Sequence, residues 1–346
     1  MKSLRKNATW LLLVGFLFWI AQAEAGSGAR TGTAGGQELL IPVGGVGIAM
    51  GGAYASGITG VEAIYWNPAG IPVFNGSTEA LFSHMNYLAS INVEYAAVAA
   101  KLGGVGTLAF SVQSLGFGAI PVTTVEQPDG TGDTYSPTYL TLGLSYARQM
   151  TDKIYFGATA KLVTENILRE SANGVAFDFG LQYHSSVTGL KFGVVMKNIG
   201  PMMQFSGPDL EQSVQLPGTE PGTQPRPVAI TAQSFDLPTT LEFGASYDYG
   251  FADNSRITLS GSFLNHNYQY DDFKLGAEVM YNDLVFLRGG YLMSPDTPTG
   301  DRVFGFSAGG GLKFKLSENL NVAFDYAYRA TDFFVDNQVF AVRVGF

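Results

Sequence analysis

Three histidines, His84, His184 and His266, are the residues best suited by type to metal binding or general acid–base chemistry. They lie far apart in the sequence, on separate expected strands, so we expect no metal site. The chain has no cysteine, which excludes a thiol nucleophile, a disulfide framework and a cysteine metal site. Residue types alone leave a Ser-His-Asp set open. We assign no catalytic residue and predict that the protein is not an enzyme.

A glycine-rich stretch, residues 44–70, is the next candidate for chemistry because such loops can cradle phosphates. No Lys-Ser/Thr pair follows it, however, so it lacks the phosphate-loop pattern. The net charge of −9 argues against nucleic acid as a partner, since nucleic-acid binding needs a basic patch. We therefore expect no cofactor and no nucleic-acid partner.

The composition indicates which elements must position any functional residues. Charged residues make up only 14 % of the chain, against about 25 % in a typical soluble domain. Aromatic residues make up 13 %, and beyond the N-terminus no long uninterrupted apolar run occurs. Low charge with dispersed apolar residues is typical of a transmembrane β-barrel, in which every second side chain faces lipid.

Alternation with a period of two is the main pattern after residue 77. Between Leu241 and Tyr249, apolar Leu241, Phe243 and Tyr247 alternate with polar or small residues, and residues 320–328 repeat this. We predict an all-β fold, a transmembrane antiparallel β-barrel of about 14 strands. The expected strands lie near residues 78–87, 91–102, 104–115, 137–149, 153–165, 174–185, 189–198, 239–250, 255–265, 270–281, 284–292, 303–316, 319–328 and 338–346.

The connections and the C-terminus support an outer-membrane barrel. Every second connection is short, such as Gly103-Gly104, whereas the others include the long loops Gly116–Ser136 and Gly200–Pro238. Outer-membrane barrels combine short periplasmic turns with long outer loops. The last strand ends on Phe346, and a terminal aromatic residue resembles the signal presented to the barrel assembly machinery.

The N-terminus predicts a secretory signal peptide over residues 1–25. Lys2, Arg5 and Lys6 form a basic region, Trp10 to Ile20 is apolar, and Ala23-Glu24-Ala25 fits a cleavage site. The apolar run is shorter than the roughly 20 residues of a membrane-spanning helix. We predict export to the outer membrane of a Gram-negative-type (diderm) bacterium, with outer-membrane lipid as the surroundings.

The mature chain is predicted to have three parts. Residues 26–43 form a flexible periplasmic N-terminal segment, residues 44–76 a plug in the barrel lumen, and residues 77–346 the barrel. A short helix is expected between Ile48 and Ser56. The predicted plug residues are Met50, Gly51, Gly52, Tyr54, Trp66, Asn67 and Pro68.

The inward face of the expected strands carries charges of both signs together with small residues. The mixed signs predict ion pairs across a mostly filled interior. The inward glycines would leave room for the plug. They are Gly157, Gly180, Gly193, Gly244, Gly276 and Gly305.

The long loop Gly200–Pro238 is the candidate surface for a partner or ligand. It opens with Met202, Met203 and Phe205, which we predict to form its contact surface. Methionine gives an adaptable apolar contact, and the repeated prolines of the loop limit the entropy lost on binding. A shielding loop without a partner is the alternative.

Several motifs resemble the PorV/PorQ group of outer-membrane proteins, which is related to the FadL-type transporters of hydrophobic compounds. The first motifs are residues 50–54 (MGGAY) and 65–70 (YWNPAG). Residues 237–238 with 243–247, 288–291 and 325–328 are similar to later strands of the group. One departure is residues 57–60 (GITG), which replace an acidic pair and leave only Glu62.

The resemblance implies a fourteen-stranded barrel with the N-terminal segment in its lumen. A PorV-like member would carry a secreted cargo protein at the outer face, as in type IX secretion, and this is the function that we predict. A FadL-like member would instead admit hydrophobic small molecules and release them sideways into the membrane. A purely structural outer-membrane protein is a third possibility.

Overall fold

The computed structural model describes residues 30–346, except 186–187, 216–217, 219–223, 225 and 299. The predicted signal peptide and residues 26–29 lie outside the described residues. Among those described, no helix is long and apolar enough to cross a membrane.

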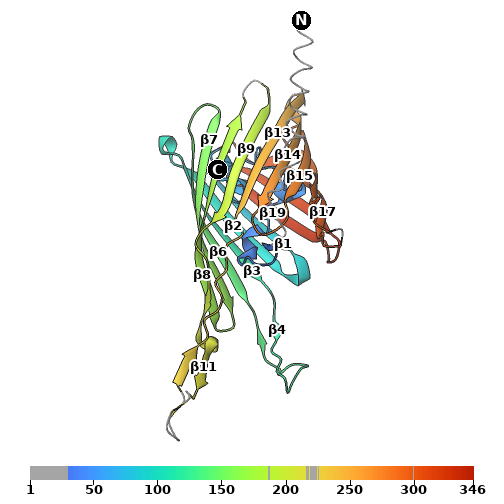
Figure 1. Ribbon diagram of the computed structural model, residues 1–346. Helices are drawn as coiled ribbons and strands as arrows, with labels where there is room; N and C mark the ends of the chain where they lie inside the picture. Colours follow the sequence, from blue (N-terminus) through green and yellow to red (C-terminus); the bar gives the residue numbers. More distant parts are fainter. Residues whose placement is uncertain (1–29, 186–187, 216–217, 219–223, 225, 299) are drawn as a thin grey trace.

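The fold is a closed antiparallel barrel of 14 long strands (Figure 1). Each barrel strand pairs with its neighbours in the chain, β8 pairs with β9, and β1 pairs with β19 to close the ring. The fold class predicted from the sequence is confirmed. The barrel strands are β1 (Thr78–Asn86), β2 (Asn92–Lys101), β3 (Thr107–Gly116), β6 (Thr138–Gln149), β7 (Ile154–Ile167), β8 (Glu170–His184), β9 (Leu190–Ile199), β13 (Thr240–Ala252), β14 (Ser255–His266), β15 (Asp272–Tyr281), β16 (Val285–Met293), β17 (Phe304–Lys315), β18 (Asn321–Thr331) and β19 (Asn337–Gly345).

The strands expose apolar side chains on the outside and bury polar side chains inside. On β18, Phe324 and Tyr326 are exposed, whereas Asp325 and Ala327 between them are buried. A soluble sandwich would show the reverse. An apolar outer face around a polar interior is the arrangement of outer-membrane barrels, so the strands are built to face lipid.

The two ends of the barrel differ in their connections. One end has short turns, including the 3-10 turn η6 (Gly103–Val105). The long-loop end carries η5 (Leu88–Ser90) and two small hairpins, which project beyond the barrel wall (Figure 1). One hairpin pairs β4 (Ile120–Pro121) with β5 (Thr134–Tyr135), and the other pairs β11 (Glu211–Val214) with β12 (Arg226–Ala229). Short turns face the periplasm in this fold, so the long-loop end is the outer end.

The N-terminal segment, residues 34–74, runs as a chain of short helical turns. These are η2 (Gln37–Leu40), α2 (Gly45–Ala49), η3 (Gly60–Glu62), α3 (Ala63–Trp66) and η4 (Pro68–Gly70). The expected helix between Ile48 and Ser56 instead lies earlier, at α2. It ends before Gly51 and Gly52, whose φ angles of +64° and +76° are left-handed and cannot continue a helix.

This segment touches opposite arcs of the barrel. Its helix α2 contacts β16, β17, β18 and β19, and its turn η4 contacts β6, β7 and β8. Most of its side chains are buried, including Ile48, Met50 and Ile58. A segment with these contacts lies within the ring of strands.

Glycines on the inner faces of the strands make this close approach possible. A β-carbon added at Gly157, Gly180, Gly193, Gly276 or Gly290 would lie closer than 3.0 Å to an atom of the N-terminal segment. Four of these five glycines are among those predicted to make room. The predicted Gly305 lies against Tyr291 instead.

Residues 30–43 differ from the expected flexible periplasmic segment. Ala34 forms a parallel bridge with Asp236, which belongs to the long loop at the outer end. Leu39, Ile41 and Val43 are buried. The apolar side chains of this stretch therefore hold it against the outer end of the barrel rather than leave it in the periplasm.

Candidate functional site

Two cavities of more than 500 Å³ lie inside the barrel, one towards each end. The outer cavity, at the long-loop end, has a volume of about 580 Å³. The inner cavity, at the short-turn end, has a volume of about 530 Å³. No residue lines both cavities. Residues of the N-terminal segment contribute to the lining of both.

Aromatic rings line the outer cavity. Tyr65 and Trp66 of α3 form its floor and meet edge to face, with ring centres 5.1 Å apart. Tyr87 and Phe304 stack at 6.4 Å on one side. On the other side, the rings of Phe117 and Tyr139 also line the cavity, at 4.8 Å from each other. These surfaces suit an apolar or aromatic guest.

The Trp-Asn-Pro-Ala-Gly turn fixes the cavity floor. Trp66 Nε1 donates to the carbonyl oxygen of Val43 at 3.1 Å. Asn67 accepts from the amide of Ala69 at 3.1 Å and donates to the carbonyl oxygen of Ala55 at 2.8 Å, so it caps η4. Pro68 stands at the first position of η4, where its missing N–H costs nothing.

Most inward charges form ion pairs. Lys161 meets Asp178 at 2.6 Å, Lys274 meets Glu242 at 3.2 Å, and Arg288 meets Asp325 at 2.6 Å. This confirms the pairing expected from mixed signs.

Two cations at the outer cavity are exceptions. The side chains of Lys197 and Arg329 form no hydrogen bond and no ion pair with any described residue. Each lies against aromatic rings instead. Lys197 Nζ is 4.6 Å from the centre of the Tyr65 ring, and Arg329 Cζ is 3.4 Å from the centre of the Phe304 ring.

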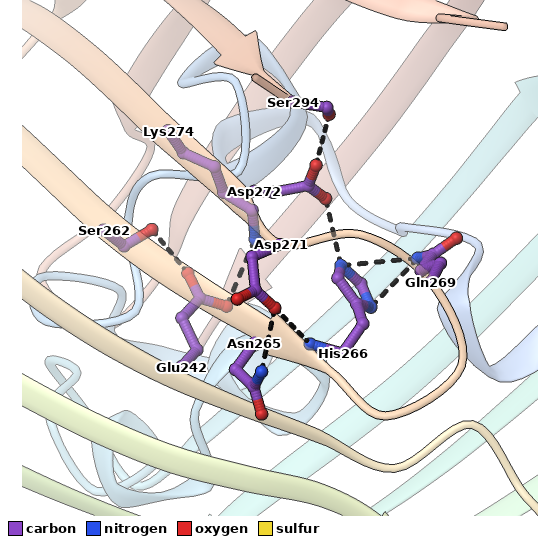
Figure 2. A network of polar contacts seen from close by, with 9 residues as sticks. All are labelled: Glu242, Ser262, Asn265, His266, Gln269, Asp271, Asp272, Lys274 and Ser294. Carbon is purple, nitrogen blue, oxygen red and sulfur yellow. Dashed lines mark hydrogen bonds and ion pairs between the residues drawn. The ribbon is translucent and has the colours of Figure 1, made fainter. Parts of the chain in front are cut away.

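A polar network borders the outer cavity at the β14–β15 connection (Figure 2). His266 Nε2 lies 3.0 Å from Asp272 Oδ2, and the hydroxyl of Ser294 donates to the same carboxylate. Gln269 donates to His266 Nδ1 at 2.9 Å. Asp272 thus stands between the serine and the histidine. In a hydrolytic triad the histidine is central, so this set orients the loop rather than activating Ser294.

A glutamate of the N-terminal segment also lines the outer cavity. Burial, followed by the charge of Glu165, raises the pKa of the Glu38 carboxyl to about 8. Glu165 in turn accepts the amide of Gly36 at 3.1 Å. The hydrogen bond from Gly36 to Glu165 thus joins the segment to β7.

The inner cavity has a different character. Its lining includes four cations and three carboxylates. These are Arg256, Arg288, Lys313, Arg343, Glu79, Glu278 and Asp283. A lining with this many charges suits water or polar solutes and opposes an apolar guest.

The structure places the predicted plug residues on two sides of the segment. Gly51, Gly52 and Trp66 border the outer cavity, whereas Tyr54 borders the inner cavity. Met50 packs against Gly276 of β15, and Asn67 and Pro68 pack against Gly180 and Gly157.

The predicted loop residues do not form one surface. Met202 is 60 % exposed, but Met203 is only 1 % exposed and packs with Leu39 and Leu237. Phe205 of β10 (Phe205–Ser206) is half-buried and pairs with Ala172 of β8. Successive residues of this extended stretch point to opposite sides, so only Met202 is available to a partner.

Sequence reasoning missed one serine motif and most of the outer cavity. Residues 305–309 read G-F-S-A-G around Ser307, which lines the outer cavity. A nucleophile elbow needs a sharp strand-to-helix turn, and here β17 simply continues. Within the described part of the chain, no histidine bonds Ser307, and no group of three His, Cys, Asp or Glu residues could hold a metal ion.

Comparison with known proteins gives a fold but no family. No protein-family model and no curated protein matches the chain. Solved structures do match. The Pseudomonas putida toluene transporter TodX is 14 % identical, with a TM-score of 0.56 over 88 % of this chain and 98 % of its own.

Two further channels match similarly well. The Ralstonia pickettii toluene transporter TbuX is 16 % identical, with a TM-score of 0.53 over 88 % of this chain and 98 % of its own. The monoaromatic hydrocarbon channel CymD is 14 % identical, with a TM-score of 0.55 over 88 % of this chain and 97 % of its own. The chain therefore shares its barrel fold with proteins described as toluene transporters and as a hydrocarbon channel.

Proposed function

We propose that the protein is an outer-membrane channel that takes up hydrophobic small molecules through the outer cavity. The observation that carries this proposal is the aromatic lining of the outer cavity, to which Tyr65, Trp66 and Phe304 all contribute. The fold shared with toluene transporters supports the same function. Of the two functions considered from the sequence, the FadL-like one thus gains support over the PorV-like one.

The N-terminal segment acts as the plug in this proposal. It lies between the two cavities, and at the inward glycines its backbone packs directly against the wall. An apolar molecule that buries roughly 200 Å² in the outer cavity gains about 5 kcal/mol. The same molecule would gain little among the charged side chains of the inner cavity.

A sideways exit avoids the inner cavity. Between β8 and β9 the pairing shifts register between Phe177 and Phe179. At the outer end of β9, which is Ile199, a buried apolar cluster lies beside β8. The cluster consists of Leu39, Val163, Ala172, Ala176, Met203 and Leu237. Apart from the two-residue pairing of β10 with β8, side-chain packing holds this part of the wall. Such packing separates more readily than a long paired strand, so this is the place where we expect the guest to leave.

Uptake by cells tests the proposed function. Phe304→Ala and Tyr87→Ala each remove a ring from the outer cavity and should reduce uptake of a labelled alkylbenzene severalfold. Phe324→Ala is the matched control, because this ring lies on the lipid-facing side of the wall. Equal uptake by all four proteins, at equal membrane levels, would refute the proposal.

A carrier for secreted proteins is the second candidate. The observation in its favour is the pair of projecting hairpins, β4–β5 and β11–β12, each a separate two-stranded sheet with free edges. An extended peptide can add to such an edge. Removing residues 207–230 should then abolish capture of a secreted protein and leave alkylbenzene uptake intact.

A further inference from the structure

We propose that the outer cavity selects aromatic acids, an anionic group attached to an apolar ring, over neutral hydrocarbons. This inference rests on the proposed function and names the substrate class of that site. It comes from the two unpaired cations, Lys197 and Arg329.

The surroundings of Lys197 carry a surplus positive charge. The residue is 7 % exposed, and the charged groups that act on it most strongly are Lys161, Lys274, Asp178 and Glu242. Three cations therefore face two carboxylates. Each carboxylate already has its own partner, since Asp178 meets Lys161 and Glu242 meets Lys274. One positive charge is left over at the cavity floor.

Arg329 gives a second, independent sign of a missing anion. Its Nη1 atom is buried and has no hydrogen-bond partner among the described residues. The nearby carboxylate, Asp272, is held by His266 and Ser294. Both cations line the same cavity and lie near Tyr65. An anion bound above Tyr65 would therefore lie within their common field.

Ring contacts alone do not satisfy these cations. A cation over an aromatic face gains a modest attraction, whereas a buried charge without a counter-ion loses much of its hydration. An anionic guest supplies the missing partner and leaves the ring contacts in place. A neutral hydrocarbon would cover both cations and leave them unpaired, which is unfavourable.

The body of the guest is inferred from the rings beside the cations. Tyr65 and Trp66 lie under Lys197, and Tyr87 stacks on the Phe304 ring that Arg329 covers. An anion drawn to either cation thus brings its attached group against an aromatic face. A rigid ring can stack there and loses little conformational entropy, whereas an alkyl chain must be ordered.

The fluorescence of a native tryptophan can report this binding. Of the three tryptophans, Trp10 and Trp19 lie in the predicted signal peptide, so Trp66 is the only one in the expected mature chain. It lies on the floor of the outer cavity. Titrating its fluorescence with 4-propylbenzoate, propylbenzene and decanoate compares an aromatic acid, its neutral counterpart and an alkyl acid.

We expect 4-propylbenzoate to bind at least about tenfold more tightly than propylbenzene, as a charged hydrogen bond would give. Lys197→Met and Arg329→Met should each remove most of this difference, by weakening 4-propylbenzoate binding and relieving the cost of covering an unpaired cation with propylbenzene. Heat-modifiable migration on detergent gels shows that both variants are folded. Lys313→Met, in the inner cavity, is the matched control.

Equal affinity for 4-propylbenzoate and propylbenzene would overturn the inference and leave the proposed function intact. Tighter binding of decanoate than of 4-propylbenzoate would overturn the aromatic class. If no compound changes Trp66 fluorescence and none is taken up by cells, the proposed function itself fails.

Discussion

Lys197 on β9 and Tyr65 on α3 meet 4.6 Å apart, from Nζ to the ring centre, at the floor of the outer cavity. The contact joins a strand of the barrel wall to the N-terminal segment. Neither element alone forms the candidate site. The position of the segment therefore decides the shape of the cavity.

Two adjacent glycines of β16 test whether the segment closes the barrel. A β-carbon at Gly290 would collide with Gly51, whereas one at Gly289 would make only an ordinary contact, 3.9 Å from the carbonyl oxygen of Ser307. Gly290→Ala should displace the segment at a cost of about 1–3 kcal/mol, the usual effect of overpacking, and should raise leakage of small solutes from liposomes. Gly289→Ala should leak as little as the native protein. Equal leakage from the two variants would show that the segment is not the barrier.

The raised pKa of Glu38 predicts that the N-terminal segment loosens as pH rises. Its pKa is raised from 4.5 to about 8, so between these values the seated form holds a proton that the released form does not. The seated form therefore loses stability progressively from about pH 4.5 to 8. A spin label on Gln37→Cys, the only thiol of the chain, should become more mobile over this range.

Glu38→Gln is the control for the pH experiment. The amide cannot ionise, so the label on Gln37→Cys should keep the same mobility across the range. An unchanged pH response in this variant would assign the effect to another group.

Leu237 tests the sideways exit. It is buried with Leu39 and Met203 in the wall beside β8. Leu237→Ala opens a cavity at a cost of about 2–5 kcal/mol and should speed release of a bound alkylbenzene into the bilayer. Leu181→Ala, on the outer face of β8, should not. A release rate that neither change alters would place the exit elsewhere.

The C-terminal residue tests barrel closure. The carbonyl oxygen of Phe346 accepts the amides of Ser77 at 2.6 Å and Thr78 at 3.2 Å, next to the β1–β19 pair. Deleting Phe346 should reduce the heat-modifiable form on detergent gels, since both the terminal aromatic ring and these closing bonds are lost. Phe340→Ala removes an outward ring of the same strand and should assemble normally. Normal membrane levels after the deletion would show that Phe346 is not required for assembly of the barrel.

The strands could be predicted from the sequence because alternation is a local signal. Each of the 14 expected ranges overlaps one barrel strand, and β13, expected near 239–250, runs from Thr240 to Ala252. The same alternation predicted which glycines face the barrel interior. The helix near Gly51 was misplaced because helical spacing does not reveal a left-handed φ angle.

The outer cavity could not be predicted in the same way. Its rings come from places far apart in the chain, among them Tyr65 on α3, Phe117 beyond β3 and Phe304 on β17. Lys161 and Lys197 both read as inward lysines. Only the three-dimensional arrangement shows that Asp178 pairs with Lys161 and leaves Lys197 without an ion-pair partner in the part of the chain that the structure describes.

Crystals soaked with a bromine-labelled alkylbenzene or its carboxylate provide the most direct measurement, because anomalous scattering locates the bromine. The proposed function predicts a bromine peak in the outer cavity, among Tyr65, Trp66 and Phe304. A peak in the inner cavity, or none inside the barrel at saturating ligand, would contradict it.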